Sequence, residues 1–371
     1  MTRPIILANT CGFACVVLTQ TPHLTTKLEK KIRIQEEIEK DIPFDGNPCN
    51  YDKFTHPQPK TSKDGRRVSD MKCEEYSWHY WAYVTEKKRY DAECAKILGN
   101  RRTQIYGGMA VKPGDFPHMG AVGWRLPNDT LTFLCGSSLI SPKFALTAAH
   151  CRAAIKKVYQ DRDKPYLVRF GSVYIGNDAD QGVPVDINIA RFLVFPEYLE
   201  HPKWKYNDIA LIELELEVHI IPNMRPACLW NGDLGNNWSA NITGWGTTPS
   251  GLPSNYLIYA QVDYFDKETC KRYVNHRRNR NWEKGLIEHQ FCAGKLNGSA
   301  DTCQGDSGGP LQIRQPMPMG IPGEIDYVVG VTSFGIACGY PYLPSVYINV
   351  TSFLCWIEKT VWPEERNDFC M

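Results

Sequence analysis

Short apolar runs separated by turn residues fill the chain after residue 105. The runs are rich in β-branched and aromatic residues, and clusters of Gly, Pro, Asn and Asp stand between them. They lie at residues 143–151, 166–175, 207–215, 327–335 and 345–350. This spacing predicts an all-β domain, built as a sandwich or a barrel.

The last apolar segment follows a helical period instead. In residues 351–362, "TSFLCWIEKTVW", apolar side chains recur at helical spacing, and Pro363 follows. Because a proline disfavours helical backbone at the residue before it, we expect a closing helix that ends there.

The region before residue 105 is polar. Residues 24–40, "LTTKLEKKIRIQEEIEK", have three apolar side chains partly on one side, which predicts either a short amphipathic helix or a solvated one. Residues 43–104 are rich in Pro, Lys, Asp and Tyr. We expect residues 21–104 to be a mostly irregular pro-segment with little core of its own.

The first 20 residues have a basic residue and then a mostly apolar run. This pattern predicts a secretory signal peptide, and the alternative is a buried or untargeted segment. The run is shorter than the roughly 20 apolar residues that a membrane span needs. With 42 basic and 41 acidic residues, the chain has no bulk attraction to nucleic acid or anionic membranes. We expect a secreted, extracellular protein with neither partner.

Cysteine usage supports that compartment. The 14 cysteines are spread singly, and beyond the first 20 residues none shows the C-x-x-C spacing of a zinc site. Scattered cysteines in even number indicate disulfides in an oxidising compartment. Five N-x-S/T triplets would permit glycosylation, at Asn128, Asn237, Asn241, Asn297 and Asn349.

Three short motifs carry chemistry. In "DTCQGDSGGP", residues 301–310, glycines on both sides of Ser307 allow a tight turn that presents its hydroxyl. A serine hydroxyl is a poor nucleophile without a base within hydrogen-bond reach. "LTAAHC" supplies His150, and "NDIALIEL" supplies Asp208, which could fix the imidazole tautomer. Each fragment alone has an ordinary structural explanation, but the three together predict nucleophilic catalysis.

The order His, Asp, Ser with these surrounding words resembles the chymotrypsin/trypsin-type serine proteases, over residues 105–362. "FPHMGAVGW" and the cysteine-bearing pro-segment look more narrowly like arthropod secreted cascade proteases of the snake and persephone type. The resemblance implies two six-stranded antiparallel β-barrels, with the active site in the cleft between them. It assigns residues 105–371 to the protease domain.

The resemblance also implies the catalytic roles. Ser307 would attack the scissile carbonyl, His150 would move the proton, and Asp208 would hold the imidazole. The backbone N–H groups of Gly305 and Ser307 would form the oxyanion hole. Ser333 would contact the buried aspartate and begin the substrate-binding edge.

In the same way Asp301, six residues before the nucleophile, would form the floor of the primary pocket. A buried carboxylate is costly unless it meets a cation, so this one should select Arg or Lys. Gly335 would keep one wall open, and Phe334 stands where the family usually has Trp. Ser345 replaces the usual Gly and could narrow the pocket, which would favour Arg over Lys. The alternative is a structural Asp301 in a pocket too crowded for long side chains.

Ile105, in "NRRTQIYGG", resembles the new amino terminus of an activated family member. Its ammonium would pair with Asp306 and order the turn bearing Gly305. Family members are usually cut after Arg or Lys, whereas Gln104 precedes this bond. Either an activator of different specificity cuts there, or a cut at residues 101–102 is followed by trimming. The segment could also be a bait for foreign proteases.

The resemblance further implies disulfides, with Cys94–Cys228 tethering the pro-segment after cleavage. We also expect Cys49–Cys73 and Cys355–Cys370. A complete clip domain, which carries six cysteines in this family, is not expected. The other implied pairs are Cys135–Cys151, Cys270–Cys292 and Cys303–Cys338.

Two weaker features of the sequence also have ordinary structural explanations. The basic residues 271–284 could be an exosite for an acidic protein, but a solvated loop is the simpler interpretation. Asp178 and Asp180 could help to bind calcium, although the ligand set is incomplete and an ordinary turn explains them.

The sequence therefore predicts a secreted serine endopeptidase zymogen in an extracellular immune or developmental cascade, without a metal or organic cofactor. Its partners would be a protein substrate such as a downstream zymogen, an upstream activating protease and a serpin-type inhibitor. The main rival is a catalytically silent, protease-like binding protein, whose usual mark is a lost triad residue. A digestive protease fits less well, since digestive zymogens need only a short removable peptide.

Overall fold

The structure is a computed structural model of the 371-residue chain. Its contacts divide the chain into two units, Met1–His56 and Pro57–Met371, and every described residue lies in the second. The predictions for the signal peptide and for residues 24–40 lie outside the described part. The structure describes residues 65–98 and 114–370, apart from gaps at 127, 154–163, 177–183, 200–204, 234, 236–237, 248–251, 276–284, 304, 336–340 and 366–368.

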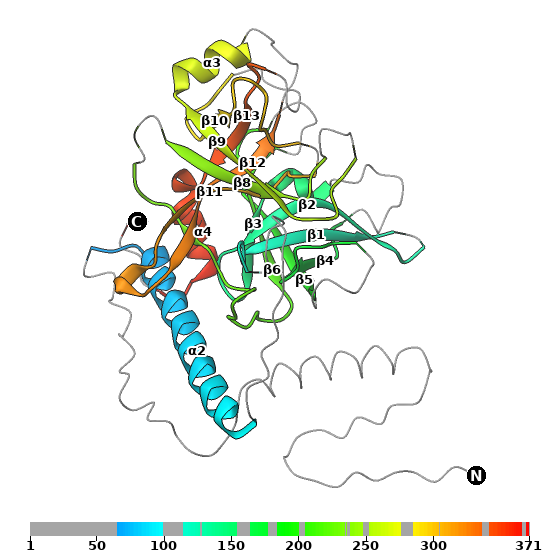
Figure 1. The fold of residues 1–371 in the computed structure, drawn as a ribbon. Helices are drawn as coiled ribbons and strands as arrows, with labels where there is room; N and C mark the ends of the chain where they lie inside the picture. The colour runs from blue at the N-terminus through cyan, green and yellow to red at the C-terminus, as the bar shows by residue number, and fades with distance from the viewer. Residues whose placement is uncertain are drawn as a thin grey trace. The chain divides into compact units, whose positions relative to one another are not determined.

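The first half of residues 114–370 forms a closed six-stranded antiparallel barrel, with strand order β1-β2-β3-β6-β5-β4 (Figure 1). Its interior side chains, among them Val122, Phe170 and Leu211, are fully buried. The strands are β1 (Met119–Arg125), β2 (Leu131–Leu139), β3 (Phe144–Thr147), β4 (Leu167–Phe170), β5 (Val185–Val194) and β6 (Ala210–Leu214).

The second half is another barrel of six antiparallel strands. The order β11-β8-β9-β10-β13-β12 closes because β11 also pairs with β12. The two-residue strand β7 (Cys228–Leu229) adds to β12 in parallel. The strands are β8 (Ser239–Gly244), β9 (Ile258–Phe265), β10 (Gln290–Gly294), β11 (Pro310–Pro316), β12 (Glu324–Phe334) and β13 (Ser345–Asn349). The prediction of two six-stranded antiparallel barrels is confirmed.

The closing helix is confirmed as well. A 3₁₀ turn η6 (Val350–Phe353) starts at Asn349, whose side-chain oxygen accepts the N–H of Thr351 at 3.2 Å. Helix α4 (Leu354–Val361) follows and ends before Pro363. Its buried residues pack with the apolar cluster of the first barrel, and Phe195 meets Trp356 edge to face. Two further short elements are α3 (Lys267–Asn275) and η5 (Pro318–Gly320).

A long helix, α2 (Val68–Leu98), lies within the segment expected to be mostly irregular, and it was not predicted. Its 31 residues contain neither proline nor glycine, so nothing in the sequence interrupts the backbone. Its charged and aromatic residues are mixed around the helix, so the sequence shows no apolar repeat of helical period. Figure 1 shows it in blue, with its first turns beside α4. Within the described residues, no helix is both long and apolar enough to cross a membrane.

Three predicted disulfides are confirmed, namely Cys135–Cys151, Cys270–Cys292 and Cys355–Cys370. Cys303 is disulfide-bonded, and its expected partner, residue 338, lies in a gap of the described chain.

The pairing of Cys228 corrects two predictions. Its partner is Cys73, with a Cα–Cα distance of 5.2 Å, so both Cys94–Cys228 and Cys49–Cys73 were wrong. The first turns of α2 pack on β7 and bring Cys73 to Cys228. Cys94 lies about 30 Å further along the same helix at 1.5 Å per residue, far beyond disulfide reach.

Candidate active site

The pairing of β3 with β6 brings two of the predicted side chains together. Thr147, the last residue of β3, lies opposite Ala210, the first residue of β6. His150 follows β3 in the 3₁₀ turn η3 (Ala149–Ala153), and Asp208 precedes β6. Both residues therefore lie at the same end of one strand pair.

Both carboxylate oxygens of Asp208 contact His150. One oxygen lies 2.7 Å from Nδ1 of the imidazole, and the other accepts the backbone N–H of His150 at 2.8 Å. The hydroxyl of Ser333, on β12 of the second barrel, donates to Asp208 at 2.6 Å. A carboxylate on Nδ1 favours the tautomer that leaves Nε2 as the basic nitrogen.

The electrostatics of this pair keep Asp208 ionised. Its side chain is completely buried, and burial alone would raise the pKa of the carboxyl. The adjacent His150, the positive charge of Lys205 and the Ser333 hydroxyl outweigh burial and lower this pKa to about 2. Lys205 was missed from the sequence, although it stands only three residues before Asp208.

The turn that carries Ser307 leads into β11 and is held against the first barrel. The N–H of Gly136 on β2 donates to the carbonyl oxygen of Ser307 at 2.8 Å. The sulfur of Cys151, next to His150, lies 3.6 Å from the same oxygen. At Gly308, with φ +78°, any Cβ would collide with Thr147 on β3. The close approach that only glycine permits thus brings Ser307 beside the turn that carries His150.

Two backbone N–H groups of this turn are free to donate. Within the described chain, no acceptor takes the N–H of Gly305 or of Ser307. Gly305 has φ +102°, in the region that favours glycine. Both N–H groups are therefore available as hydrogen-bond donors to a substrate.

Asp306 lies behind the turn and points toward β8. Its two carboxylate oxygens accept the N–H of Gly246 at 2.8 Å and of Cys303 at 2.9 Å. No cation lies within 4.0 Å of it in the part of the chain that is described. Burial raises the pKa of Asp306, and the two backbone N–H groups offset this only in part. Side chains at Gly244 or Gly246 would collide with it, so both glycines make room for the carboxylate.

Asp301 forms a polar cluster with β13. Its Oδ1 accepts the hydroxyl of Ser345 at 2.6 Å and the backbone N–H of Thr302 at 2.8 Å. A Cβ added at Gly335 would lie 2.9 Å from the Ser345 hydroxyl, so Ser345 faces the wall that Gly335 leaves open. Phe334 ends β12 and packs with a cluster around Phe265. The structure therefore brings together Asp301, Gly335 and Ser345, three of the residues predicted for the pocket.

Metal candidates fall into two groups. The sulfurs of Cys135 and Cys151 approach His150 closely enough to suggest a metal site among the described residues. They are joined in a disulfide, however, so neither is a thiolate ligand. The calcium candidates, Asp178 and Asp180, lie outside the described residues, as do Gln104 and Ile105 of the predicted activation site.

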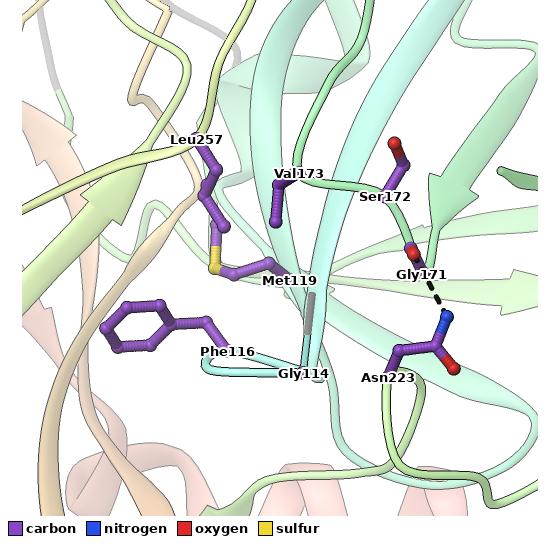
Figure 2. A pocket seen from close by; sticks show the side chains of 8 residues that line it. All are labelled: Gly114, Phe116, Met119, Gly171, Ser172, Val173, Asn223 and Leu257. Carbon is purple, nitrogen blue, oxygen red and sulfur yellow. Dashed lines mark hydrogen bonds between the residues drawn. The ribbon is translucent and has the colours of Figure 1, made fainter. Parts of the chain in front are cut away.

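A small pocket elsewhere is lined by none of these residues (Figure 2). Its polar side chains are already engaged, since Asn223 donates to the carbonyl of Gly171 at 3.1 Å and Ser172 to that of Tyr174 at 2.7 Å. None of the described residues that line it is charged. Its lining residues are Gly114, Phe116, Met119, Gly171, Ser172, Val173, Asn223 and Leu257.

Comparisons with known proteins agree with this geometry. The sequence model of the family described as Trypsin matches residues 105–357. The chain is 33% identical to Serine protease snk of Drosophila melanogaster over 309 residues, which covers 81% of this chain and 66% of that protein. It is 32% identical to CLIP domain-containing serine protease B4 of Anopheles gambiae over 271 residues, covering 70% of this chain and 71% of that protein. It thus spans a little under two thirds of the first relative and somewhat more of the second.

A solved structure is also similar. Neuropsin, a serine protease expressed in the limbic system of mouse brain, matches 69% of this chain and all of its own length. The TM-score is 0.53 and the sequence identity is 29%.

Proposed function

Because the chain belongs to the trypsin family of serine proteases, we propose that it is a secreted serine endopeptidase zymogen that cuts proteins after arginine. The observation that carries the proposal is the 2.7 Å contact between Nδ1 of His150 and the buried Asp208. Further support is that the carbonyl oxygen of Ser307 lies 3.6 Å from the sulfur of Cys151, the residue after His150. His150, Asp208 and Ser307 are the three side chains that acyl transfer by a serine hydroxyl requires.

In the proposed mechanism, the hydroxyl oxygen of Ser307 attacks the scissile carbonyl while Nε2 of His150 takes its proton. Asp208 stays ionised, holds the tautomer and stabilises the imidazolium that forms. His150 then gives the proton to the leaving amine, which departs and leaves an acyl-enzyme. Water enters by the reverse of these steps, releases the acid and restores Ser307. No step uses a metal or an organic cofactor.

The free N–H groups of Gly305 and Ser307 would hold the oxyanion in both halves of the reaction. Donors aimed at the developing charge stabilise the transition state more than the substrate. Loss of one such donor typically lowers the rate by about 10²–10³-fold.

Asp301 would receive the cationic side chain of the residue before the scissile bond. The hydrogen bond from Ser345 supports a preference for arginine, because Oδ1 already accepts two donors. A guanidinium offers several N–H groups in a planar fork and can reach the carboxylate and the serine oxygen together. A lysine ammonium is a point charge with less reach, so we propose weaker cleavage after lysine.

Activation would be a cut before Ile105, after which the new ammonium pairs with Asp306. Support comes from the carboxylate of Asp306, which meets only backbone N–H groups among its described neighbours. Gln104 requires either an activator that is not trypsin-like or a cut nearby followed by trimming.

The partners would be a protein substrate, such as a downstream zymogen in an extracellular immune or developmental cascade, an upstream protease and a serpin-type inhibitor. The names of both relatives describe serine proteases, which supports the class but not the pathway. A catalytically silent binding protein is the second candidate, favoured by Gln104 and by Ser345, which would narrow the pocket.

The test replaces the bond after Gln104 with an enteropeptidase site, cuts it, and assays peptides with Arg, Lys or Phe before the scissile bond. Rapid turnover of the Arg peptide, absent in a Ser307→Ala chain cut in the same way, is the expected result. No turnover by a chain with a verified Ile105 terminus would instead support the binding protein.

A further inference from the structure

A buried carboxylate of the C-terminal helix is bound by residues that precede the predicted protease domain. Glu358, on α4, is 1% exposed. Its Oε2 accepts Nη2 of Arg67 at 2.9 Å, and its Oε1 accepts Nε of the same guanidinium at 3.2 Å. The hydroxyl and the backbone N–H of Ser69 donate to Oε1 at 2.6 and 3.1 Å. A carboxylate in the core is thus matched by a cation and a hydroxyl from outside residues 105–371.

The following turns of α2 continue the contact along one face. Cys73 bonds to Cys228 four residues after Ser69, and the hydroxyl of Tyr76 accepts the indole N–H of Trp362 at 2.9 Å. Tyr80 is at the same face one turn later, with the guanidinium of Arg225 at 4.0 Å from its ring centre. Spacings of four, seven and eleven residues lie on one side of a helix.

Flanking polar pairs and an apolar cluster widen this contact. Asp70 accepts the side-chain amide of Asn231 at 2.6 Å, and the ammonium of Lys72 lies 2.9 Å from Glu365. Beneath them, both cysteines of the disulfide are buried with residues that precede and begin β12, and aromatic residues of α2 pack against the group. The cluster is Cys73, Cys228, Met317, Ile321 and Ile325, with Trp78, Tyr80, Trp81 and Tyr327 at its edge.

We propose that residues 67–81, here the docking segment, are a permanent part of the protease body, held by these side-chain contacts and not by the disulfide alone. The proposal rests on the proposed function only for the place of the activation cut. A cut before Ile105 would leave a two-chain molecule whose chains stay together even without the Cys73–Cys228 bond. A body that began at Ile105 would lack the cation and the hydroxyl that these residues supply to Glu358, and it would lose their packing against the apolar cluster.

The first test removes the disulfide from the full chain. A Cys73→Ser, Cys228→Ser, Ser307→Ala chain with the enteropeptidase site is cut and passed through a size-exclusion column without denaturant. We expect both fragments to elute together. Separation into a free N-terminal fragment and a folded body would overturn the proposal. Because Ser307 is absent, neither outcome depends on the chain being a protease.

The second test keeps the disulfide and compares two adjacent arginines. Arg67 pairs with Glu358 of the body, whereas Arg66, two residues before α2, pairs with Glu74 on that helix. Arg67→Met should lower the Tm of the full chain by about 5–10 °C, because it leaves a buried carboxylate without this cation. Arg66→Met is the matched control and should shift it by no more than about 2 °C. Equal small shifts would contradict the proposal.

A double-mutant cycle removes the remaining ambiguity. If the two groups act as one pair, Glu358→Gln in the Arg67→Met chain should cost much less Tm than it does in the unmodified chain. Additive shifts would mean that the pair does not hold the docking segment. Should Arg67→Met fail to fold, Ser69→Ala provides the milder variant, for which a fall of a few degrees is expected.

Discussion

Two carboxylates near the candidate nucleophile have pKa shifts of opposite sign. Asp208 is completely buried, yet His150, Lys205 and Ser333 lower its pKa to about 2. Asp306 is held by two backbone N–H groups, and burial raises its pKa. The first carboxylate has its cation built into the body, and the second has none among its described neighbours. Under the proposed function, the pair His150–Asp208 is already assembled in the uncut chain, whereas the turn beside Ser307 would be completed by the new ammonium of Ile105.

The largest effect should come from replacing Asp208, the carboxylate whose positively charged partners lie within the fold. Asp208→Asn would present an amide N–H to Nδ1 of His150 and favour the tautomer in which Nε2 is protonated. We expect kcat of the chain cut before Ile105 to fall by about 10⁴-fold. Arg-peptide hydrolysis under saturating substrate measures it, with Asp233→Asn, an exposed acid, as the control. A loss below about tenfold would contradict the role given to Asp208.

Asp306→Asn should have a smaller effect on activity and a distinct effect on stability. Without the carboxylate, the ammonium of Ile105 has no partner, and we expect kcat/KM to fall by about 10²–10³-fold. A group whose pKa is raised by folding stabilises the fold below its unfolded pKa and loses that contribution as pH rises. At pH 7, well above the unfolded pKa of an aspartate, the burial of Asp306 therefore lowers the stability of the uncut chain. The new ammonium would relieve this destabilisation.

Calorimetry before and after the cut distinguishes the loss of the proposed Ile105–Asp306 pair from a local defect of the turn. The cut should raise the Tm of the Ser307→Ala chain at pH 7 by a few degrees. In the chain that also carries Asp306→Asn, this rise should vanish. A rise of equal size in both chains would show that Asp306 does not receive the terminus.

Replacing Ser345 beside Asp301 should have a moderate effect on the preference for arginine over lysine. Ser345→Gly removes the hydroxyl that occupies Oδ1 of Asp301 and opens space beside Gly335. We expect the ratio of kcat/KM for Arg over Lys peptides to fall by about five- to tenfold, the equivalent of one hydrogen bond. Ser345→Ala keeps most of the volume, so a similar fall there would assign the effect to the hydrogen bond. An unchanged ratio in both variants would exclude Ser345 from specificity.

The smallest effect is in acid stability. The pKa of Asp208 falls from 3.8 to about 2 on folding, so its contribution is present above about pH 4 and is lost as the pH falls toward 2. A shift of this size corresponds to about 2 kcal/mol. Urea unfolding from pH 5 to pH 2 should therefore be less pH-dependent for Asp208→Asn. Parallel curves for the two chains would contradict the lowered pKa.

The β-rich class of the domain could be predicted because its signals are local, whereas the two barrels and the pair His150–Asp208 followed from the resemblance to a known family. Alternating strands and turn residues stand next to one another in the sequence, and the motifs around His150 and Ser307 are short and specific. The hydrogen bond between Ser345 and Asp301 is different, since Ser345 departs from the glycine usual in the family and the resemblance could not supply its contact. The sequence indicated only a narrower pocket there.

Helix α2 and its disulfide could not be predicted for a related reason. The docking segment binds through Arg67, Ser69 and aromatic side chains, so its contact face does not read as an apolar stripe. The choice between Cys73 and Cys94 depends on which turn of α2 packs against β7. Only the tertiary contact decides that, and from the sequence both cysteines were available.

We propose that Ser307 becomes a nucleophile when the chain is cut before Ile105. The most direct measurement is covalent labelling of Ser307 by a fluorophosphonate before and after the engineered cut, read by peptide mass spectrometry. We expect stoichiometric labelling of Ser307 in the cut chain and much slower labelling in the uncut chain. Absence of label from a folded chain with a verified Ile105 terminus would contradict it.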